Sequence, residues 1–400
     1  MLSQLRTSVA LAAAQAATFA SRATGRGAGG MIGGLVANAI DPNIMAGLSK
    51  GRPAVLVTGT NGKSTTTKML VAALRSTRTV ATNDGGDNMD AGIISALMAG
   101  KDASTIALEV DELHVPHVAD RLQPKAFVLL NLSRDQLDRV GEINKIERAL
   151  RGAVNAHPEA TVIWVSACAG WLGDSVTNPR SGGHVVRTED DWYAVEPLPD
   201  GSEFRRPTPT YAVTDDGLRC PDGGVVTLDL ALPGRANRGN AAQAVACAVD
   251  VFGVPLASAL AAVADVQDVA GRYSTIHFGD HEVRLLLAKN PAGWQEALSM
   301  VDRTADGLVI AVNGQVADGE DLSWLWDVKF EDFHGIAVKA AGERGTDLAV
   351  RLLYADIEHE LIHNCVDAIR ACPPGRVEVL ANYTAFRDLK KDLHKELDRD

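Results

Sequence analysis

Hydrophobic and polar positions follow one another in repeated blocks that predict strands followed by helices. The block 54–76, AVLVTGTNGKSTTTKMLVAALRS, has an apolar run, a glycine-rich turn and an amphipathic stretch, which indicates a strand, a loop and a helix. Two further apolar runs, at 104–112 and 126–139, end in polar residues. Units of this kind are typical of a parallel sheet covered by helices, which binds ligands at the carboxyl ends of its strands. We therefore expect an α/β fold whose polar strand ends form one site.

This periodicity is lost in the middle of the chain. Between about 164 and 226, Pro, Gly, Asp and Arg accumulate, which favours an insertion of loops and short strands. A helix is predicted at 237–252, and the apolar segment 283–289 is expected to open a second domain.

The second domain is predicted to be a smaller α/β unit. Its expected strands are GLVIAVNGQ, at 307–315, and RVEVLANYT, at 376–384, and its expected helices are 348–354 and 359–370. The predicted organisation is an N-terminal helical extension, a central domain with a parallel sheet and a C-terminal Rossmann-like domain, at residues 1–50, 51–280 and 281–400.

Composition excludes several classes of protein. A net charge of −12 disfavours a nucleic-acid partner, because phosphate binding needs a basic face. The cysteines are widely spaced and form no CxxC pair, so neither a disulfide framework nor a metal cage is predicted, and a reducing cytoplasm fits best. They are Cys168, Cys220, Cys247, Cys365 and Cys372.

The first forty residues are rich in Ala and Gly and contain Arg6, Arg22 and Arg26. They resemble a secretion signal only superficially, because Gln15 and Thr18 interrupt the apolar stretch. The chain has no run of about eighteen apolar residues, so no membrane span is expected. The sequence leaves two roles open for an N-terminal helix: it packs on the protein's own core, or it lies on a membrane surface.

The turn GTNGKST has the context that a phosphate loop requires, between a predicted strand and a predicted helix. Glycines let the backbone approach a phosphate, the helix N-terminus attracts it, Lys63 adds positive charge and Ser64 can bind magnesium. Glu109 ends the next strand, where its carboxylate can face the same metal, although a solvated strand end is the simpler interpretation. The candidate nucleotide ligands are Gly59, Thr60, Asn61, Gly62, Lys63, Ser64 and Thr65.

The segments TGTNGKSTT, LEVDE, NLSRDQLDRVGEI and GRANRGNAAQAVA, in this order, resemble the Mur ligase superfamily. The resemblance implies that ATP converts a carboxylate into an acyl phosphate, which an amine then attacks. It also implies that Lys63 holds the phosphates and that Ser64 and Glu109 bind Mg²⁺. Asn237 and Asn240 would lie near the adenine, with helix capping as the alternative role, and Arg272 would reach the nucleotide from the hinge.

Four C-terminal segments resemble one branch of the superfamily, the MurT subunits of lipid II isoglutaminyl synthases. They are LAKNPAGWQEAL, ADGEDLSWLWDVKFE, GERGTDLAVRLLYA and ANYTA. Only about fifty residues precede the phosphate loop, so we do not expect the UDP-binding domain of the amino-acid ligases. The resemblance implies amidation of the D-glutamate α-carboxylate of lipid II to D-isoglutamine, at the inner face of the membrane. The ammonia would come from a GatD-type glutaminase subunit.

Asp321 matches the family's aspartate that completes a Cys-His-Asp arrangement with the glutaminase partner, and Asp318 and Asp347 are the alternatives. A helix cap is the competing role for Asp321, since it precedes the apolar run LSWLW.

The chain departs from its relatives at several positions. Gln136 stands where the amino-acid ligases carry a metal-binding histidine, and Lys145 is only an uncertain counterpart of their carbamylated lysine. Relatives of this branch often have a small zinc ribbon in the middle insertion, but the LRCPDGG segment retains Cys220 alone, so no zinc site is expected. An autonomous amino-acid ligase and an inactive nucleotide-binding scaffold remain the alternative functions.

Overall fold

The computed structural model describes residues 2–23, 30–83, 86–134, 142–167, 176–188, 191–267 and 273–397. The chain divides into two compact units. The first contains 1–132, 143–169 and 175–267, and the second contains 133–142, 170–174 and 268–400.

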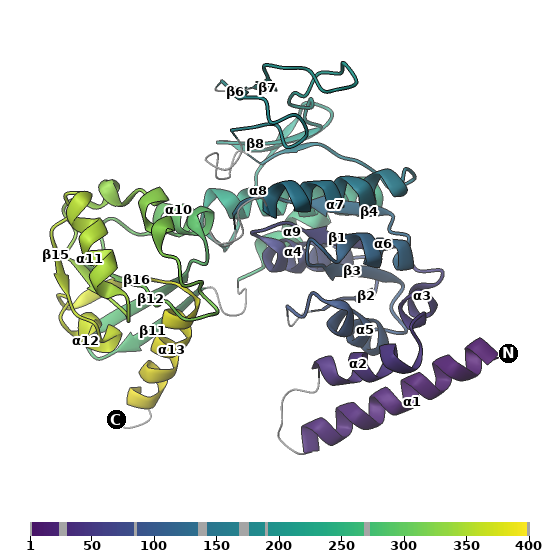
Figure 1. Ribbon diagram of the computed structural model, residues 1–400, viewed down its shortest axis with the longest axis horizontal. Helices are drawn as coiled ribbons and strands as arrows, with labels where there is room; N and C mark the ends of the chain where they lie inside the picture. Colours follow the sequence, from purple (N-terminus) through teal and green to yellow (C-terminus); the bar gives the residue numbers. More distant parts are fainter. Residues whose placement is uncertain are drawn as a thin grey trace. The chain divides into compact units, whose positions relative to one another are not determined.

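A four-stranded parallel sheet forms the centre of the first unit, as the repeated apolar runs predicted (Figure 1). Its strand order is β2 (Val80–Ala81), β3 (Thr105–Glu109), β1 (Ala54–Thr58) and β4 (Ala126–Leu129). Every residue of β1 and β3 is buried, which explains why their apolar residues follow one another directly instead of alternating with polar ones. The helices that follow the four strands are α4 (Lys63–Arg75), α5 (Asp90–Ala99), α6 (Val115–Leu122) and α7 (Glu142–Ala156).

A second group of helices covers α4. It consists of α8 (Arg235–Ala246), the π-helical turn η1 (Cys247–Val251) and α9 (Leu256–Ala264). The helix predicted at 237–252 is therefore an α-helix that widens in its last turn. Cationic side chains stabilise the carbonyl groups at that end, because Lys125 Nζ donates to Val251 O at 2.7 Å and Arg78 Nη2 to Phe252 O at 2.5 Å.

Three helices precede the sheet, α1 (Leu2–Ala23), α2 (Gly30–Ile40) and α3 (Ile44–Ser49). Helix α2 packs between α1 and α5 (Figure 1). Among the described residues, none of the helices is long and apolar enough to cross a membrane.

The segment that lacked periodicity contains short strands and loops. A small sheet has the order β10 (Val225–Val226), β9 (Gly217–Arg219), β8 (Tyr211–Thr214) and β5 (Val165–Ser166). The strands β6 (Val185–Arg187) and β7 (Trp192–Ala194) form a separate antiparallel pair.

The second unit contains a six-stranded sheet. Its order is β11 (Tyr273–Phe278), β12 (His281–Leu287), β16 (Gly375–Ala381), β13 (Gly307–Ala311), β14 (Val338–Ala341) and β15 (His359–Leu361). Only β11 pairs antiparallel to its neighbour; the other pairs are parallel. The α-helices are α10 (Pro291–Met300), α11 (Gly345–Tyr354), α12 (Cys365–Arg370) and α13 (Tyr383–Leu397), and the 3₁₀ turns are η2 (Ser323–Asp327) and η3 (Phe330–Phe333).

The helix predicted at 359–370 was wrong in its first half. His359–Leu361 pairs with β14 as the edge strand of the sheet, and helix α12 begins only at Cys365. The Asn364 side chain fixes this start, because its oxygen accepts hydrogen bonds from the backbone N–H groups of Val366 and Asp367.

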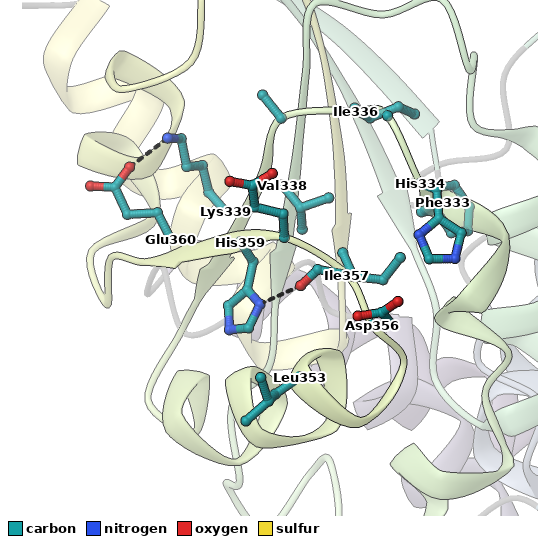
Figure 2. A pocket seen from close by; sticks show the side chains of 13 residues that line it. Phe333, His334, Ile336, Val338, Lys339, Leu353, Asp356, Ile357, His359 and Glu360 are labelled. Atoms are coloured by element: carbon teal, nitrogen blue, oxygen red, sulfur yellow. Dashed lines mark hydrogen bonds and ion pairs between the residues drawn. The ribbon is translucent and has the colours of Figure 1, made fainter.

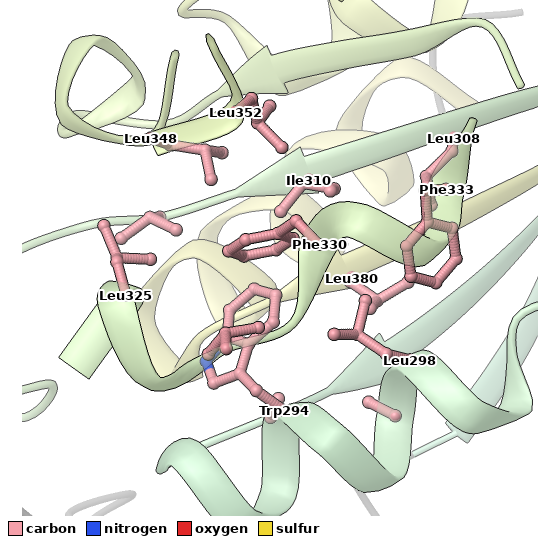
Figure 3. Close-up of a cluster of buried hydrophobic side chains, with 14 of the residues drawn as sticks. Trp294, Leu298, Leu308, Ile310, Leu325, Phe330, Phe333, Leu348, Leu352 and Leu380 are labelled. Carbon is pink, nitrogen blue, oxygen red and sulfur yellow. The ribbon is translucent and has the colours of Figure 1, made fainter. Parts of the chain in front are cut away.

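One face of this sheet carries a core built on aromatic side chains (Figure 3). Trp294 is fully buried, lies 5.4 Å from Trp324 between ring centroids and meets the Phe330 ring edge-on at 6.3 Å.

Replacing Trp294 by Ala should lower the free energy of unfolding of this unit by about 3–5 kcal/mol, since it removes a large side chain and leaves a cavity. Trp326→Ala is the control, because Trp326 is 56% exposed. This replacement should lower the free energy of unfolding by no more than about 1 kcal/mol. Denaturant unfolding of the full chain measures both, and equal losses would contradict this description of the core.

Candidate active site

The turn between β1 and α4 has the backbone geometry of a phosphate loop. Gly59 and Gly62 have φ values of 137° and 88°, which strongly favour glycine. A Cβ at Gly59 would lie 2.9 Å from Leu130 Cβ, and one at Gly62 would lie 2.7 Å from Asn240 Oδ1. Both glycines are therefore required by the close approach of neighbouring segments. Helix α4 begins at Lys63, and the N–H groups of a first helical turn are suited to binding an anion such as a phosphate.

Asn131, which follows β4, holds this turn in shape. Its backbone oxygen accepts from Thr60 N at 2.9 Å, its Oδ1 accepts from Asn61 N at 3.0 Å, and its Nδ2 donates to Asn61 O at 2.8 Å. The sequence prediction did not include Asn131. Its only signal was its position, as the polar residue directly after an apolar strand in LNLS.

Lys63 contacts its own loop and an acidic neighbour. Its Nζ donates to Gly59 O at 2.6 Å and lies 3.2 and 3.3 Å from the carboxylate oxygens of Glu112. Both side chains are largely buried, so the ion pair is shielded from solvent. Glu112 thus provides the negative charge beside Lys63 that the phosphate of a bound nucleotide would otherwise provide.

Glu109 lies at the carboxyl end of β3 and is buried. It pairs in register with Val57 of β1, the residue before Thr58, so its backbone reaches the edge of the sheet from which the phosphate loop leaves. Asn83 fixes that backbone through two hydrogen bonds of 2.8 and 2.9 Å, and Asn88 Nδ2 donates to the carboxylate at 3.3 Å. A buried carboxylate at this edge supplies the hard oxygen donor that magnesium prefers.

Asn237 and Asn240 lie on α8, whose N-cap is Gly234, so neither of them caps that helix. Asn237 Nδ2 donates to Pro233 O at 2.6 Å, and Asn240 Nδ2 lies 3.4 Å from Asn237 Oδ1. Because Asn240 also contacts the phosphate loop at Gly62, the start of α8 and the loop form one surface.

A cavity of ≈ 390 Å³ adjoins the phosphate loop at Gly59 and Asn131. Apolar side chains from β4, α7 and Trp164 form much of its wall. Glu147 accepts from Arg151 at 2.8 Å and lies 3.7 Å from Arg180, so two guanidinium groups share one carboxylate. A cavity with apolar walls and an excess positive charge suits a ligand that carries a carboxylate.

The three predicted aspartates of the second unit differ in the hydrogen bonds that they accept from the chain. Asp318 accepts from Thr384 N at 2.9 Å and from the Thr384 hydroxyl, and Asp347 accepts from Arg344 Nε at 2.8 Å. Asp321 is exposed, and one of its oxygens accepts from Ser323 N at 2.8 Å. Hydrogen bonds from Ser323 hold the pKa of the Asp321 carboxyl below its usual value, so it is ionised at neutral pH.

Three further predicted positions are Arg272, Gln136 and Lys145. Arg272 and Gln136 lie outside the described residues, and Lys145 lies on α7. Cys220 is buried, and burial raises the pKa of its thiol, which disfavours the thiolate that zinc requires. The described residues contain no group of three His, Cys, Asp or Glu side chains placed to hold a metal ion.

A hollow of ≈ 820 Å³ in the second unit lies at the amino ends of β14 and β15, away from the carboxyl edge of that sheet (Figure 2). Lys339 Nζ contacts Glu360 at 2.5 Å there, and His359 Nδ1 lies 2.8 Å from Ile357 O. The structure therefore brings none of the predicted site residues to this hollow.

Comparisons with known proteins extend over both units. Residues 57–248 match the Mur ligase middle domain, and residues 287–386 match the MurT ligase C-terminal domain. The chain is 29% identical to the lipid II isoglutaminyl synthase (glutamine-hydrolyzing) subunit MurT of Streptococcus pneumoniae, over 90% of this chain and 91% of that protein. It is 26% identical to the same subunit of Staphylococcus aureus, over 90% and 92%.

A solved structure shows the same fold. The pseudomurein peptide ligase type C from Methanothermus fervidus superimposes with a TM-score of 0.67 at 15% identity, over 89% of this chain and 81% of that one. The expected Mur-ligase-like architecture is therefore confirmed. The chain is an enzyme of the ligase class and belongs to the Mur ligase family and, within it, to the MurT subunits of lipid II isoglutaminyl synthases.

Proposed function

We propose that this chain uses ATP to convert the α-carboxylate of D-glutamate, in the stem peptide of lipid II, into an acyl phosphate. A GatD-type glutaminase subunit supplies ammonia, which attacks the acyl phosphate and gives D-isoglutamine, in the cytoplasm at the inner face of the membrane. The observation that carries this proposal is the lysine-bearing phosphate loop, fixed by Asn131, in a chain that resembles MurT subunits over both units.

The chemistry explains why two subunits are needed. A carboxylate oxygen is a poor leaving group, and phosphorylation turns it into a good one. At neutral pH most ammonia is protonated and is no longer a nucleophile, so direct delivery from a glutaminase avoids that loss. Binding energy in this chain then serves to place ATP and carboxylate together.

The described side chains suit ATP and Mg²⁺. Lys63 would exchange Glu112 for the phosphates, Asn237 and Asn240 would contact the adenine, and Ser64 with Glu109 would supply oxygen ligands to magnesium. Magnesium would offset the negative charge that develops on the transferred phosphoryl group. Zinc has no role in this proposal.

Lys63→Ala should lower ATP-dependent amidation by about 10²–10³-fold, because it removes a cation from the transferred phosphate. The fold should be retained, since Lys63 contacts Gly59 of its own loop and the Glu112 carboxylate rather than the hydrophobic core. Lys68→Ala is the control, because Lys68 is exposed on the same helix. Turnover should be measured with the partner subunit and lipid II. Near-normal turnover by a folded Lys63→Ala protein would refute the phosphate-loop assignment, whereas a wild-type complex without ATP-dependent turnover would favour the scaffold alternative.

Glu109→Ala should raise the magnesium concentration needed for half-maximal turnover by at least about tenfold, since a ligand of the metal is lost. The matched control is Asp102→Ala, which removes an exposed carboxylate from the loop before β3. A magnesium titration of ATP turnover measures the shift. If the two variants show the same magnesium dependence as wild type, Glu109 is only a buried strand end.

Asp321 is the aspartate of the second unit best placed to meet a partner. The loop that carries it follows β13, and its base is fixed by Asn382, which donates to Asn313 O at 2.7 Å and accepts from Asn313 N at 3.0 Å. Asp318 lies in the same loop, but its carboxylate already accepts a hydrogen bond from Thr384 of α13. Asp321 is exposed and ionised. An ionised aspartate that hydrogen-bonds a histidine fixes its tautomer and stabilises its charged form.

An exposed apolar surface includes Trp326, five residues after Asp321 in the sequence. Trp326, in η2, meets the Tyr354 ring edge-on at 5.3 Å, and Val350 and Leu353 are exposed on the same helix as Tyr354. Aromatic residues of this kind are enriched where proteins dock. We assign this surface, Trp326, Val350, Leu353 and Tyr354, to the glutaminase partner.

Asp321→Asn should impair amidation with glutamine far more than amidation with excess ammonium. Free ammonia bypasses glutamine hydrolysis but still needs the acyl phosphate, so only the first rate depends on Asp321. An asparagine in place of a histidine-orienting aspartate lowers turnover by up to about 10⁴-fold in triad enzymes. Rates with each nitrogen donor should be compared for wild type and the variant.

Asp318→Asn is the matched control, because it weakens the contact with Thr384 and should reduce both rates alike. Equal losses with both donors in Asp321→Asn would remove Asp321 from the glutaminase site. A selective loss in Asp318→Asn would transfer the role to Asp318.

A further inference from the structure

Helix α2 turns an apolar face toward solvent. Its sequence, GMIGGLVANAI, has no charged residue, and Met31, Ile32 and Leu35 are 44%, 41% and 57% exposed. At about 100° per residue these three side chains and Ala39 fall on one side of the helix. The opposite side contains Gly33, Gly34 and Ala37, which are buried. The helix therefore buries its small residues and exposes three of its large apolar ones, while Ile40 at its end packs against the core.

Helix α1 shows the same inversion. Val9 and Phe19 are 52% and 76% exposed, whereas Ala10 and Ala14 are fully buried. Ala12, Ala16 and Ala20 are also exposed and recur at helical spacing between and beside Val9 and Phe19. Leu11 packs against the core, but a helix that served only to cover the core would also bury residues as large and apolar as Val9 and Phe19.

Close contacts hold both helices firmly on the first unit. A Cβ at Gly34 would lie 1.8 Å from Ala91 O of α5, and one at Gly33 would lie 2.4 Å from Thr18 Oγ1 of α1. Arg6 Nε donates to Ile40 O, and Thr7 Oγ1 to Asp41 Oδ2, at 2.5 and 2.6 Å. Figure 1 shows α2 between α1 and α5, with α1 outermost. The exposed apolar faces thus belong to a packed element.

The charge of this segment is opposite to that of the chain. The first forty residues contain three arginines and neither Asp nor Glu, although the whole chain has a net charge of −12. An anionic surface attracts such a segment, and a second copy of the same segment repels it. A segment that combines basic residues with exposed apolar helix faces is typical of helices that lie in a membrane interface.

We propose that α1 and α2 form a docking surface for an anionic phospholipid bilayer, with Phe19 and Leu35 inserted at the level of the headgroups. The choice of a bilayer rests on the proposed function, because a lipid-linked substrate stays in the membrane; the apolar faces and the charge are independent of it. Neither helix crosses the bilayer. Docking keeps the active site close to the headgroup of the substrate.

Vesicle flotation with the full chain and its partner subunit tests this surface. Wild type should bind vesicles that contain phosphatidylglycerol at least about tenfold more strongly than pure phosphatidylcholine, and high salt should reduce binding. The double variant Phe19→Glu, Leu35→Glu should lose at least about tenfold in binding, because it places two carboxylates at the interface. The matched control is Val195→Glu, Val225→Glu, which adds the same charge at exposed apolar positions of the middle insertion and should bind like wild type.

Amidation distinguishes failure of docking from failure of the proposed function. The double variant should be slow with lipid II in vesicles and normal with a water-soluble, short-chain lipid II analogue. Wild type that turns over neither substrate but still floats would refute the proposed function alone. Wild type that does not float, a double variant that floats equally well, or self-association that is lost only in the double variant would overturn the docking surface.

Discussion

The hydrogen bonds between Asn131 and the turn 59–62 are the constraint on which the rest of the site depends. They join β4 to the loop after β1, so the two neighbouring strands end in one fixed shape. Gly59 and Gly62 permit this shape, and Asn240 packs against it from α8. A phosphate site that is formed in advance loses less entropy when the nucleotide binds. In the proposed function, the parallel sheet therefore supports a phosphate site that is formed in advance.

Much of this support was predictable because it is local in sequence. The strand, turn and helix at 54–76 follow from an apolar run, two glycines and an amphipathic stretch, and all three are present. The roles of Glu112 and Asn131 were not predictable, because they depend on contacts with Lys63 and Asn61, which lie 49 and 70 residues away. The short strand at 359–361 was missed for a similar reason, since only its pairing with β14 shows it to be a strand.

The two units divide the proposed reaction between them. The first contains the phosphate loop, Glu109 and the membrane-docking helices, and the second contains Asp321 and the exposed aromatic surface of η2 and α11. Each unit has its own sheet and hydrophobic core. This separation is what allows nitrogen supply and carboxylate activation to be tested independently.

The central claim is that a substrate carboxylate becomes an acyl phosphate. The most direct measurement is the fate of ¹⁸O placed in the α-carboxylate of the D-glutamate residue of lipid II, followed by mass spectrometry of the inorganic phosphate released during amidation. An acyl phosphate requires one labelled oxygen to leave with the phosphate for each amide formed. If amide forms at the normal rate but the released phosphate contains no more ¹⁸O than the solvent water, that result contradicts the account.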